Sequence, residues 1–325
     1  MAVALESILA TAKVVSIGMR TRFRGVTTRE ALLFEGPNGW AEWSPFTEYA
    51  DEEAAVWLAA AIEFAFGAAP ALVRTEIGIN ATLPAVAPAE VAEALAPFGK
   101  FRTVKIKVAE PGQSLDDDLA RVTEVRRLFP DARLRLDANG GYEVDQAVAL
   151  GHALAESAAP IDYLEQPVKT IGELAEVRLK LKHLGILVAA DESVRKVSDP
   201  LAVAHAGAAD ILVIKAAPLG GITRALSVIR EAGLPAVISS GLETSVGISM
   251  GLHLAGALPR LDHDCGLGTV ALLEDDVCDE PLIPVAGMLP VKRVVPSGAK
   301  LKSLAASAER THWWLERLER CHKLL

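Results

Sequence analysis

Cysteine is scarce in this sequence. The 325 residues include only Cys265, Cys278 and Cys321, and no two of them form a CxxC pair. This excludes a small scaffold held together by disulfides, and an odd number of thiols is typical of a chain kept in a reducing compartment. The N-terminus also carries an acid, Glu6, where an export signal carries basic residues. We therefore expect a cytoplasmic protein.

Long uninterrupted apolar runs and clusters of basic residues are missing as well. The two most apolar stretches, 54–73 and 236–258, contain Glu63 and Glu243 respectively, whereas a helix that crosses a bilayer needs about 20 consecutive apolar residues. Lysine and arginine number 33 against 42 aspartates and glutamates, which gives a net charge of −9. Such a chain repels a phosphate backbone. We expect neither a membrane nor a nucleic acid as partner.

What the sequence does contain is an apolar content of 51% and a repeating pattern. From residue 102 onward, short apolar runs alternate with longer stretches of helical period, which is typical of a parallel sheet covered by helices. We predict strands at residues 78–83, 103–108, 133–138, 163–166, 187–191, 211–215, 236–240 and 261–265. We predict helices between them at 116–128, 145–156, 171–184, 200–205, 222–232 and 245–257. Eight strands closed by helices make an α/β protein with a (β/α) barrel.

The two ends of the chain show other patterns. Residues 13–21 and 30–34 alternate in hydrophobicity like the strands of a hairpin, and 51–66 follow as a helix with an acidic start. The chain ends in a helix, 311–320, with Trp313 and Trp314 at core spacing. We expect this tail to return to the N-terminal unit. The predicted organisation is the N-terminal part of an α+β capping domain at 1–76, a catalytic barrel at 77–279, and a C-terminal segment at 280–325 that returns to the capping domain.

Polar residues stand at the ends of the predicted barrel strands. Lys105 and Lys107 are two residues apart, so they share one face of their strand. The later strands end with Asp137 and Asn139, with Glu165, with Asp191 and Glu192, with Lys215, and with Ser239, Ser240 and Gly241. In a barrel these ends converge on one mouth, where barrel enzymes keep their active sites. The pattern therefore predicts an active site at the mouth.

Carboxylates dominate this predicted site. Asp137, Glu165 and Asp191 would repel each other without a cation, and oxygen ligands without convergent His or Cys favour one Mg²⁺ ion, with Mn²⁺ as a substitute, over zinc. Lys107 and Lys215 would then lie on opposite sides of the ion, where nearby positive charge lowers the pKa of a lysine toward that of a general base. Such a site is equipped to remove a proton next to a carboxylate.

Short motifs carry a resemblance to a known family. They are, in chain order, Lys105-Ile-Lys107, Asp137-Ala-Asn139, Glu165-Gln-Pro167, Asp191-Glu-Ser193 and Lys215. In order and spacing they resemble the muconate-lactonizing subgroup of the enolase superfamily, and the similarity covers essentially the whole chain. The strings at 22–30, 108–114, 216–221 and 265–269 are most similar to the actinobacterial family of o-succinylbenzoate synthases.

The resemblance implies a modified (β/α)₇β TIM-like barrel with an α+β capping domain. It also implies a lyase of menaquinone biosynthesis that dehydrates a small dicarboxylate, 2-succinyl-6-hydroxy-2,4-cyclohexadiene-1-carboxylate, to 2-succinylbenzoate. By the same resemblance Asp137, Glu165 and Asp191 are the metal ligands. Lys107 is the acid and base, and Lys215 stabilises the intermediate from the opposite face.

Further residues at the mouth are predicted to support this site. Lys105 assists Lys107 or contacts a metal ligand, while Asn139 and Glu192 either hold ligands and lysines in place or merely cap strand ends. The residues predicted to contact the substrate are Arg24, Ser239, Ser240, Gly241 and Gly266. The serine and glycine loops would offer backbone N–H groups to substrate carboxylates. Arg24 would meet the anion from a capping loop, although a solvated surface arginine fits it as well.

Other functions remain possible on the sequence alone. An N-succinylamino acid racemase also needs a lysine on each face of its substrate, and other acid/base enzymes of the same superfamily share the motifs. A barrel that binds a ligand without catalysis belongs to a different class, and the intact lysines and carboxylates argue against it. The segment 266–271 matches GxGxxA, but it opens no helix of a first βα unit, so we predict no nucleotide site there.

Overall fold

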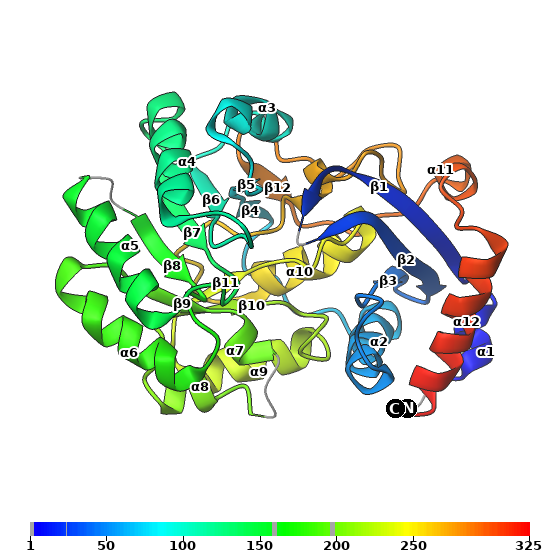
Figure 1. Cartoon of the computed structure of the whole chain (residues 1–325). Coiled ribbons are helices and arrows are strands. Elements are labelled where there is room, and N and C mark those ends of the chain that lie inside the picture. Colours follow the sequence, from blue (N-terminus) through cyan, green and yellow to red (C-terminus); the bar gives the residue numbers. More distant parts are fainter. Residues whose placement is uncertain (1–2, 24, 158–160, 196–198) are drawn as a thin grey trace.

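The computed structural model describes residues 3–23, 25–157, 161–195 and 199–325. Figure 1 shows two units: one built from both ends of the chain, coloured blue and red, and one of parallel strands and helices, coloured mainly green to yellow. We call the first unit the cap and the second the barrel.

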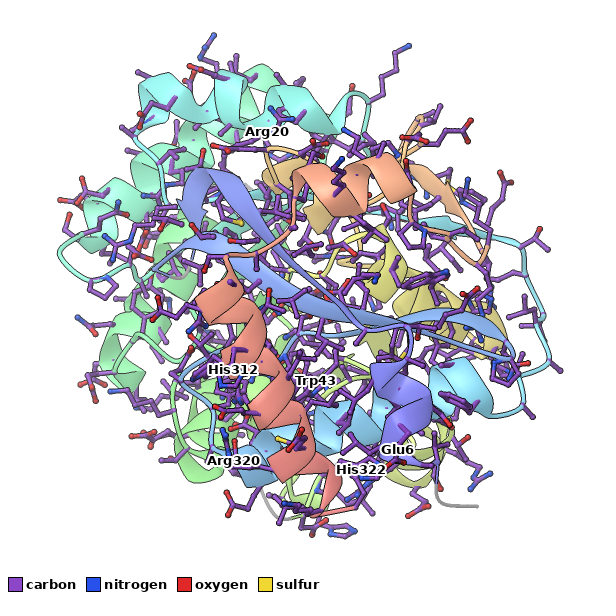
Figure 2. All side chains as sticks on the ribbon, turned by 90° about the vertical axis from the view of Figure 1, so that its right-hand side faces the viewer. Glu6, Arg20, Trp43, His312, Arg320 and His322 are labelled. Atoms are coloured by element: carbon purple, nitrogen blue, oxygen red, sulfur yellow. The ribbon has the colours of Figure 1, made fainter. Side chains whose placement is uncertain are left out.

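The cap is an antiparallel sheet packed against helices. Its elements are α1 (Leu5–Leu9), β1 (Lys13–Phe23), β2 (Val26–Gly36), β3 (Gly39–Trp43), α2 (Asp51–Phe66) and α12 (Ala308–His322). Trp43 at the end of β3 meets Trp314 of α12 edge to face, with ring centroids 5.3 Å apart. Glu30 on β2 accepts hydrogen bonds from Arg310 and from the indole of Trp314. Figure 2 shows α12 lying across this side of the cap, so the last helix covers a core begun by the first strands.

The barrel is a curled parallel sheet. Within the described residues it holds seven strands: β5 (Ala81–Leu83), β6 (Thr103–Lys107), β7 (Arg133–Asp137), β8 (Ile161–Glu165), β9 (Val188–Ala190), β10 (Ile211–Ile214) and β11 (Ala236–Ile238). They are paired in chain order from β5 to β11. Two single bridges close the ring, because Cys265 pairs with Ile79 before β5 and Gly266 pairs with Ser239 after β11. The predicted fold class is confirmed.

Helices cover the outside of this sheet. They are α3 (Val91–Leu95), α4 (Leu115–Leu128), α5 (Val144–Glu156), α6 (Ile171–Leu181), α7 (Glu192–Arg195), α8 (Ala202–His205), α9 (Ile222–Ala232) and α10 (Ser245–Ala257), with α11 (Gly298–Ser303) on the return to the cap. Ser114 and Thr170 cap α4 and α6 by accepting from the third amide of each helix. Helix α10 is buried along nearly its whole length, which explains its apolar sequence. In the described part of the chain no helix combines the length and apolarity needed to cross a bilayer.

Two of the predicted strands were wrong, and two strands were missed. The segment 78–83 is divided at Asn80: β4 (Glu76–Gly78) pairs with β12 (Met288–Pro290), and only β5 joins the barrel. Asn80 uses its side-chain amide to bind the Ala81 carbonyl, which breaks the run. The polar segment 261–265 forms no strand beyond the bridge at Cys265. The missed strands are β3, whose five residues are too few to show a clear alternation, and β12, which has only three residues.

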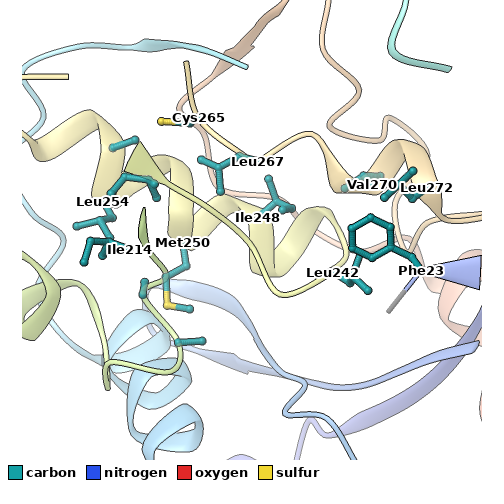
Figure 3. Close-up of a cluster of buried hydrophobic side chains, with 14 of the residues drawn as sticks. Phe23, Ile214, Leu242, Ile248, Met250, Leu254, Cys265, Leu267, Val270 and Leu272 are labelled. Atoms are coloured by element: carbon teal, nitrogen blue, oxygen red, sulfur yellow. The ribbon is translucent and has the colours of Figure 1, made fainter. Parts of the chain in front are cut away.

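One continuous apolar core joins the cap to the barrel. Phe23, at the tip of the cap hairpin, belongs to the same buried cluster as Leu242, Val270 and Leu272 of the barrel. Figure 3 shows these side chains beside α10. Burial of apolar surface contributes about 25 cal/mol per Å², so this shared core fixes the cap above the mouth of the barrel.

Candidate active site

Strand register places the predicted catalytic residues in one row. Lys107 is paired with Asp137, and Asp137 with Glu165, at the last positions of β6, β7 and β8. Asp191 and Lys215 directly follow β9 and β10. These strands are adjacent in the sheet and parallel, so their carboxyl ends meet at one edge. The residues that were expected to converge from the sequence therefore do converge.

Two lysines bind the first two carboxylates of this row. Lys107 Nζ lies 2.5 Å from Asp137 Oδ2 and 2.6 Å from Asn139 Oδ1. Lys105 Nζ bridges the carboxylates, at 3.0 Å from both Asp137 Oδ2 and Glu165 Oε1. Burial works against the charged form of Lys105, but Asp137 and Glu165 outweigh it and raise the pKa of Lys105. Lys105 is thus held as a cation between two acids.

The third carboxylate has cationic partners of its own. Lys215 Nζ donates to Asp191 Oδ2, and Arg195 Nε donates to Asp191 Oδ1 at 3.0 Å. Burial opposes ionisation of Asp191, yet these two cations hold its pKa well below the usual range. Burial is also the main reason why the pKa of Lys215 is lowered, and Arg195 adds to the effect. Lys215 therefore has one carboxylate partner where Lys105 has two, and it has an arginine nearby.

Asn139 and Glu192 are placed to hold Lys107. Asn139 accepts from Lys107 and donates its side-chain amide to Glu192 Oε1 at 3.2 Å. Asn139 has a φ of 47°, a left-handed conformation that asparagine tolerates better than most residues. This local conformation turns the side chain back toward the lysine.

Gln166 is a site residue that the sequence did not reveal. It is fully buried, and its Oε1 accepts from the amides of Asp191 and Ser193 at 3.0 and 3.1 Å. Its Nε2 donates to Ser193 Oγ and to the Val168 carbonyl. Gln166 thereby fixes the backbone at Asp191. It stands in the motif with Glu165, but no spacing rule distinguishes it from an ordinary strand-end residue.

The chemistry of the donor set fits a divalent metal ion. Asp137, Glu165 and Asp191 are at most 1% exposed. Burial, and then the charges of Asp137 and Asp191, raise the pKa of Glu165 to about 7, so a further positive charge beside these acids would favour the ionised form of Glu165. Among the described residues, no three His, Cys, Asp or Glu side chains are grouped as a metal site. The oxygens of these carboxylates are instead paired with the ammonium groups of the lysines.

An inner cavity of about 30 Å³ lies at this edge of the sheet. Its lining residues are Phe23, Phe46, Thr82, Lys105, Lys107, Asp137, Asn139, Asp191, Lys215, Ser239, Ser240, Gly241, Leu242, Gly266 and Thr269. Beside it a cleft of about 850 Å³ runs between the cap hairpin and the barrel loops and also reaches Lys107. Phe23 and Phe46 come from the cap, and neither was predicted as a site residue, because a contact between cap and barrel has no local sequence pattern.

The residues predicted to contact the substrate line the inner cavity in part, but not with the backbone groups that were expected. Ser239, Ser240, Gly241 and Gly266 all line the inner cavity. However, the N–H groups of Ser239, Gly241 and Gly266 already donate to Ile214 O, Glu243 Oε2 and Ile238 O. The expectation that these three N–H groups face a substrate carboxylate is therefore wrong, since barrel pairing and Glu243 use them. Arg24 lies outside the described residues.

Comparisons with known proteins agree with this geometry. Residues 87–299 match the family model described as enolase C-terminal domain-like, and residues 14–65 match the one described as enolase N-terminal domain-like. The o-succinylbenzoate synthase of Mycobacterium marinum is 51% identical over 321 residues, which cover 99% of this chain and 96% of that protein. The o-succinylbenzoate synthase of Mycobacterium tuberculosis is 52% identical over the same shares.

Solved structures show the same architecture. The 2-chloromuconate cycloisomerase from Rhodococcus opacus matches with a TM-score of 0.76 at 23% identity, covering 91% of this chain and 98% of that chain. A muconate lactonizing enzyme from Pseudomonas fluorescens, in complex with muconolactone, matches with a TM-score of 0.75 at 19% identity and the same shares. At such identities the structures establish the fold, while the sequence relatives and the family models identify the lineage. The chain belongs to the enolase superfamily and, within it, to the family of the o-succinylbenzoate synthases.

Proposed function

We propose that this chain is a lyase that dehydrates 2-succinyl-6-hydroxy-2,4-cyclohexadiene-1-carboxylate to 2-succinylbenzoate, a step of menaquinone biosynthesis in the cytoplasm. The observation that carries the proposal is the pair of buried lysines, Lys107 and Lys215, at the ends of β6 and β10 with the carboxylate-bearing strands between them. The name of the mycobacterial relatives supports the product. The substrate is a small dicarboxylate.

Members of the enolase superfamily use a divalent metal ion. We assign one Mg²⁺ here, which Mn²⁺ can replace, with Asp137, Glu165 and Asp191 as its ligands. When bound, the ion supplies positive charge for the substrate carboxylate on which negative charge develops. It would also reduce the repulsion from Asp137 and Asp191, which adds to burial in raising the pKa of Glu165.

Lys107 is assigned as the acid and base. In its neutral form, Nζ takes the proton from the ring carbon that bears the carboxylate, and the electron pair moves into an enediolate. Collapse of the enediolate breaks the neighbouring carbon–oxygen bond, and the hydroxyl leaves as water with the proton that Lys107 returns. Both proton transfers occur on one face, so a single lysine suffices for a syn elimination. Asn139 and Asp137 hold Nζ in place at 2.6 and 2.5 Å.

Lys215 is assigned to the opposite face, where its ammonium group stabilises the enediolate electrostatically. Lys105 acts in support, because its ammonium group bridges the carboxylates of Asp137 and Glu165. Glu192 holds Asn139. Ser239, Ser240, Gly241 and Gly266 form the wall that receives the substrate, and Arg24 is kept as a candidate contact from the cap.

We further propose that residues 1–76 and 280–325 together form the capping domain, with the catalytic barrel at 77–279. The contacts of α12 with α2, β1 and α1 support this division. So does the ion pair of Arg320 with Asp51, which joins the last helix to the start of α2.

The test is turnover of the cyclohexadiene acid, followed by the ultraviolet absorbance of the aromatic product. We expect rapid conversion with Mg²⁺, little conversion in EDTA, and recovery when Mg²⁺ or Mn²⁺ is added back. Full activity in chelator would contradict the metal assignment.

A second assay separates this function from racemisation. A racemase must deliver a proton to the face opposite the one it was taken from, so both lysines must exchange protons with its substrate. We expect little exchange of the α-proton when N-succinylamino acids are incubated with the enzyme in D₂O. Exchange at a rate that rivals dehydration would identify a racemase or a bifunctional enzyme.

A further inference from the structure

Arg29 lies directly behind the wall of the inner cavity. It is on β2 of the cap and is 3% exposed. Its guanidinium donates to backbone carbonyls of two different units: Nε to Leu242 at 3.1 Å, Nη2 to Gly241 at 3.2 Å, and Nη2 also to Ser44. Gly241 and Leu242 belong to the barrel loop after β11, whereas Ser44 follows β3 in the cap. One side chain thus ties the two units together.

The same guanidinium also supports an aromatic wall of the cavity. Its central carbon lies 4.5 Å from the ring centroid of Phe46. Phe46, Gly241 and Leu242 all line the cavity that contains the lysines. Leu242 has a φ of 67°, a left-handed conformation that costs a leucine free energy and persists only where surrounding contacts enforce it. The carbonyl of Leu242 is one of those that Arg29 binds.

Two buried acids next to Arg29 hold the same loop from its other side. Glu243 accepts from the amide of Gly241 at 2.5 Å. Glu42, on β3 of the cap, accepts from the amides of Thr244 and Gly247 at 3.0 and 3.1 Å. These amides lie at the N-terminus of α10, where a negative charge is favourable. The cap therefore supplies both a guanidinium and a carboxyl group to residues 239–247 of the barrel.

We propose that Arg29 is a positioning residue for substrate binding: by fixing Gly241, Leu242 and Phe46 together, it holds the cavity in the shape that receives the dicarboxylate. Without the guanidinium, three buried carbonyls would lose their donor, and the strained loop would relax away from the cavity. Only the identity of the ligand rests on the proposed function.

The matched control for this proposal is Arg74. Its guanidinium also binds three barrel carbonyls, those of Ala255, Leu258 and Pro259, but at the opposite end of α10 and away from the cavity. We compare Arg29→Met, Arg29→Lys and Arg74→Met. In Arg29→Met we expect KM to rise about tenfold, the equivalent of roughly one net hydrogen bond, with a much smaller change in kcat. Arg29→Lys should recover part of this loss, because lysine keeps the charge but not the planar fork. Arg74→Met should keep the wild-type KM.

Amide hydrogen exchange gives a readout that needs no substrate. We expect the amides of residues 239–244 to exchange faster in Arg29→Met than in the wild type or in Arg74→Met. If the amides exchange faster in Arg29→Met but the wild-type protein does not dehydrate the cyclohexadiene acid, the proposed function is wrong and the positioning role still holds. A folded Arg29→Met enzyme with wild-type KM and wild-type exchange would overturn the proposal. If Arg29→Met does not fold, the same two measurements on Arg29→Lys decide it in the same way.

Discussion

At the scale of single residues, three chemically identical lysines meet different surroundings. Lys105 bridges two carboxylates and has a raised pKa, while Lys215 is buried beside Arg195 and has a lowered pKa. Lys107 contacts one carboxylate and one amide, and the ring centroid of Phe23 lies 5.1 Å from its Nζ. Because a proton acceptor needs access to its neutral form, the raised pKa of Lys105 fits a supporting role rather than that of the base.

Arginine substitutions separate the duties of the two lysines. Lys107→Arg should abolish dehydration, since a guanidinium does not release its proton and cannot act as a base. Lys215→Arg should keep measurable dehydration, since it preserves the charge that faces the enediolate, although its larger shape will lower kcat. Single-turnover formation of the aromatic product measures both. Complete and equal loss in the two variants would contradict the division of roles.

A site residue was predictable from the sequence when it stands at the end of a barrel strand, and it was not when it reaches the cavity from the cap. Asp137, Glu165, Asp191 and Lys215 end consecutive strands, so a repeating sequence pattern reveals them. Phe46 reaches the cavity from the cap across about 200 residues of sequence from Leu242, and no local periodicity encodes such a contact. The prediction of an eighth barrel strand was also wrong, because its residues have no clear strand pattern. Residues 261–265 contain several polar residues and supply a single bridge, at Cys265, to the closing of the ring.

At the scale of elements, the interface of β3 with α10 stands out because it buries an acid. Burial, and then Glu243, raise the pKa of Glu42 to about 7 from an ordinary value of 4.5. Below pH 4.5 the carboxyl is protonated in both the folded and the unfolded chain. Between pH 4.5 and 7 the unfolded chain loses the proton first, so this group makes the folded state progressively less stable as the pH rises.

Glu42→Gln should therefore flatten the dependence of stability on pH. A shift of 2.5 pKa units corresponds to about 3 kcal/mol of unfolding free energy, which the wild type should lose between pH 4.5 and about 8 and the variant should retain. Glutamine still offers an oxygen to the amides of Thr244 and Gly247. Denaturant unfolding at pH 5 and pH 8, in chelator for both proteins, measures the difference. Equal slopes in the two proteins would show that Glu42 ionises in the folded chain at its ordinary pKa.

At the scale of the whole molecule, the cap depends on residues from both ends of the chain. Trp314 is fully buried, contacts Trp43, and donates to Glu30 Oε2 at 2.9 Å. The sequence predicted the terminal helix and its return, because tryptophans at core spacing require a partner surface. It also predicted the N-terminal unit as that surface, but not the contact with Trp43, since β3, at whose end Trp43 stands, was missed.

Trp314→Ala should lower the free energy of unfolding by about 3–5 kcal/mol, the usual cost of deleting a buried aromatic side chain. His312→Ala, an exposed neighbour on the same helix, should change it by less than about 0.5 kcal/mol. Chemical denaturation of both variants measures the difference. A Trp314→Ala protein as stable as the wild type would show that α12 adds little to the cap.

The closing of the cap by α12 also bears on the order of events during synthesis. The ribosome delivers β1, β2 and β3 first, then the entire barrel, and only at the end the helix that covers Trp43. Domains generally fold as their segments emerge, so the barrel is available before the cap has all its parts. The early cap strands therefore keep an apolar face exposed until α12 is made. The nascent chain is for that reason the form that we expect to bind chaperones most readily. Active enzyme is expected only after the last helix has left the ribosome.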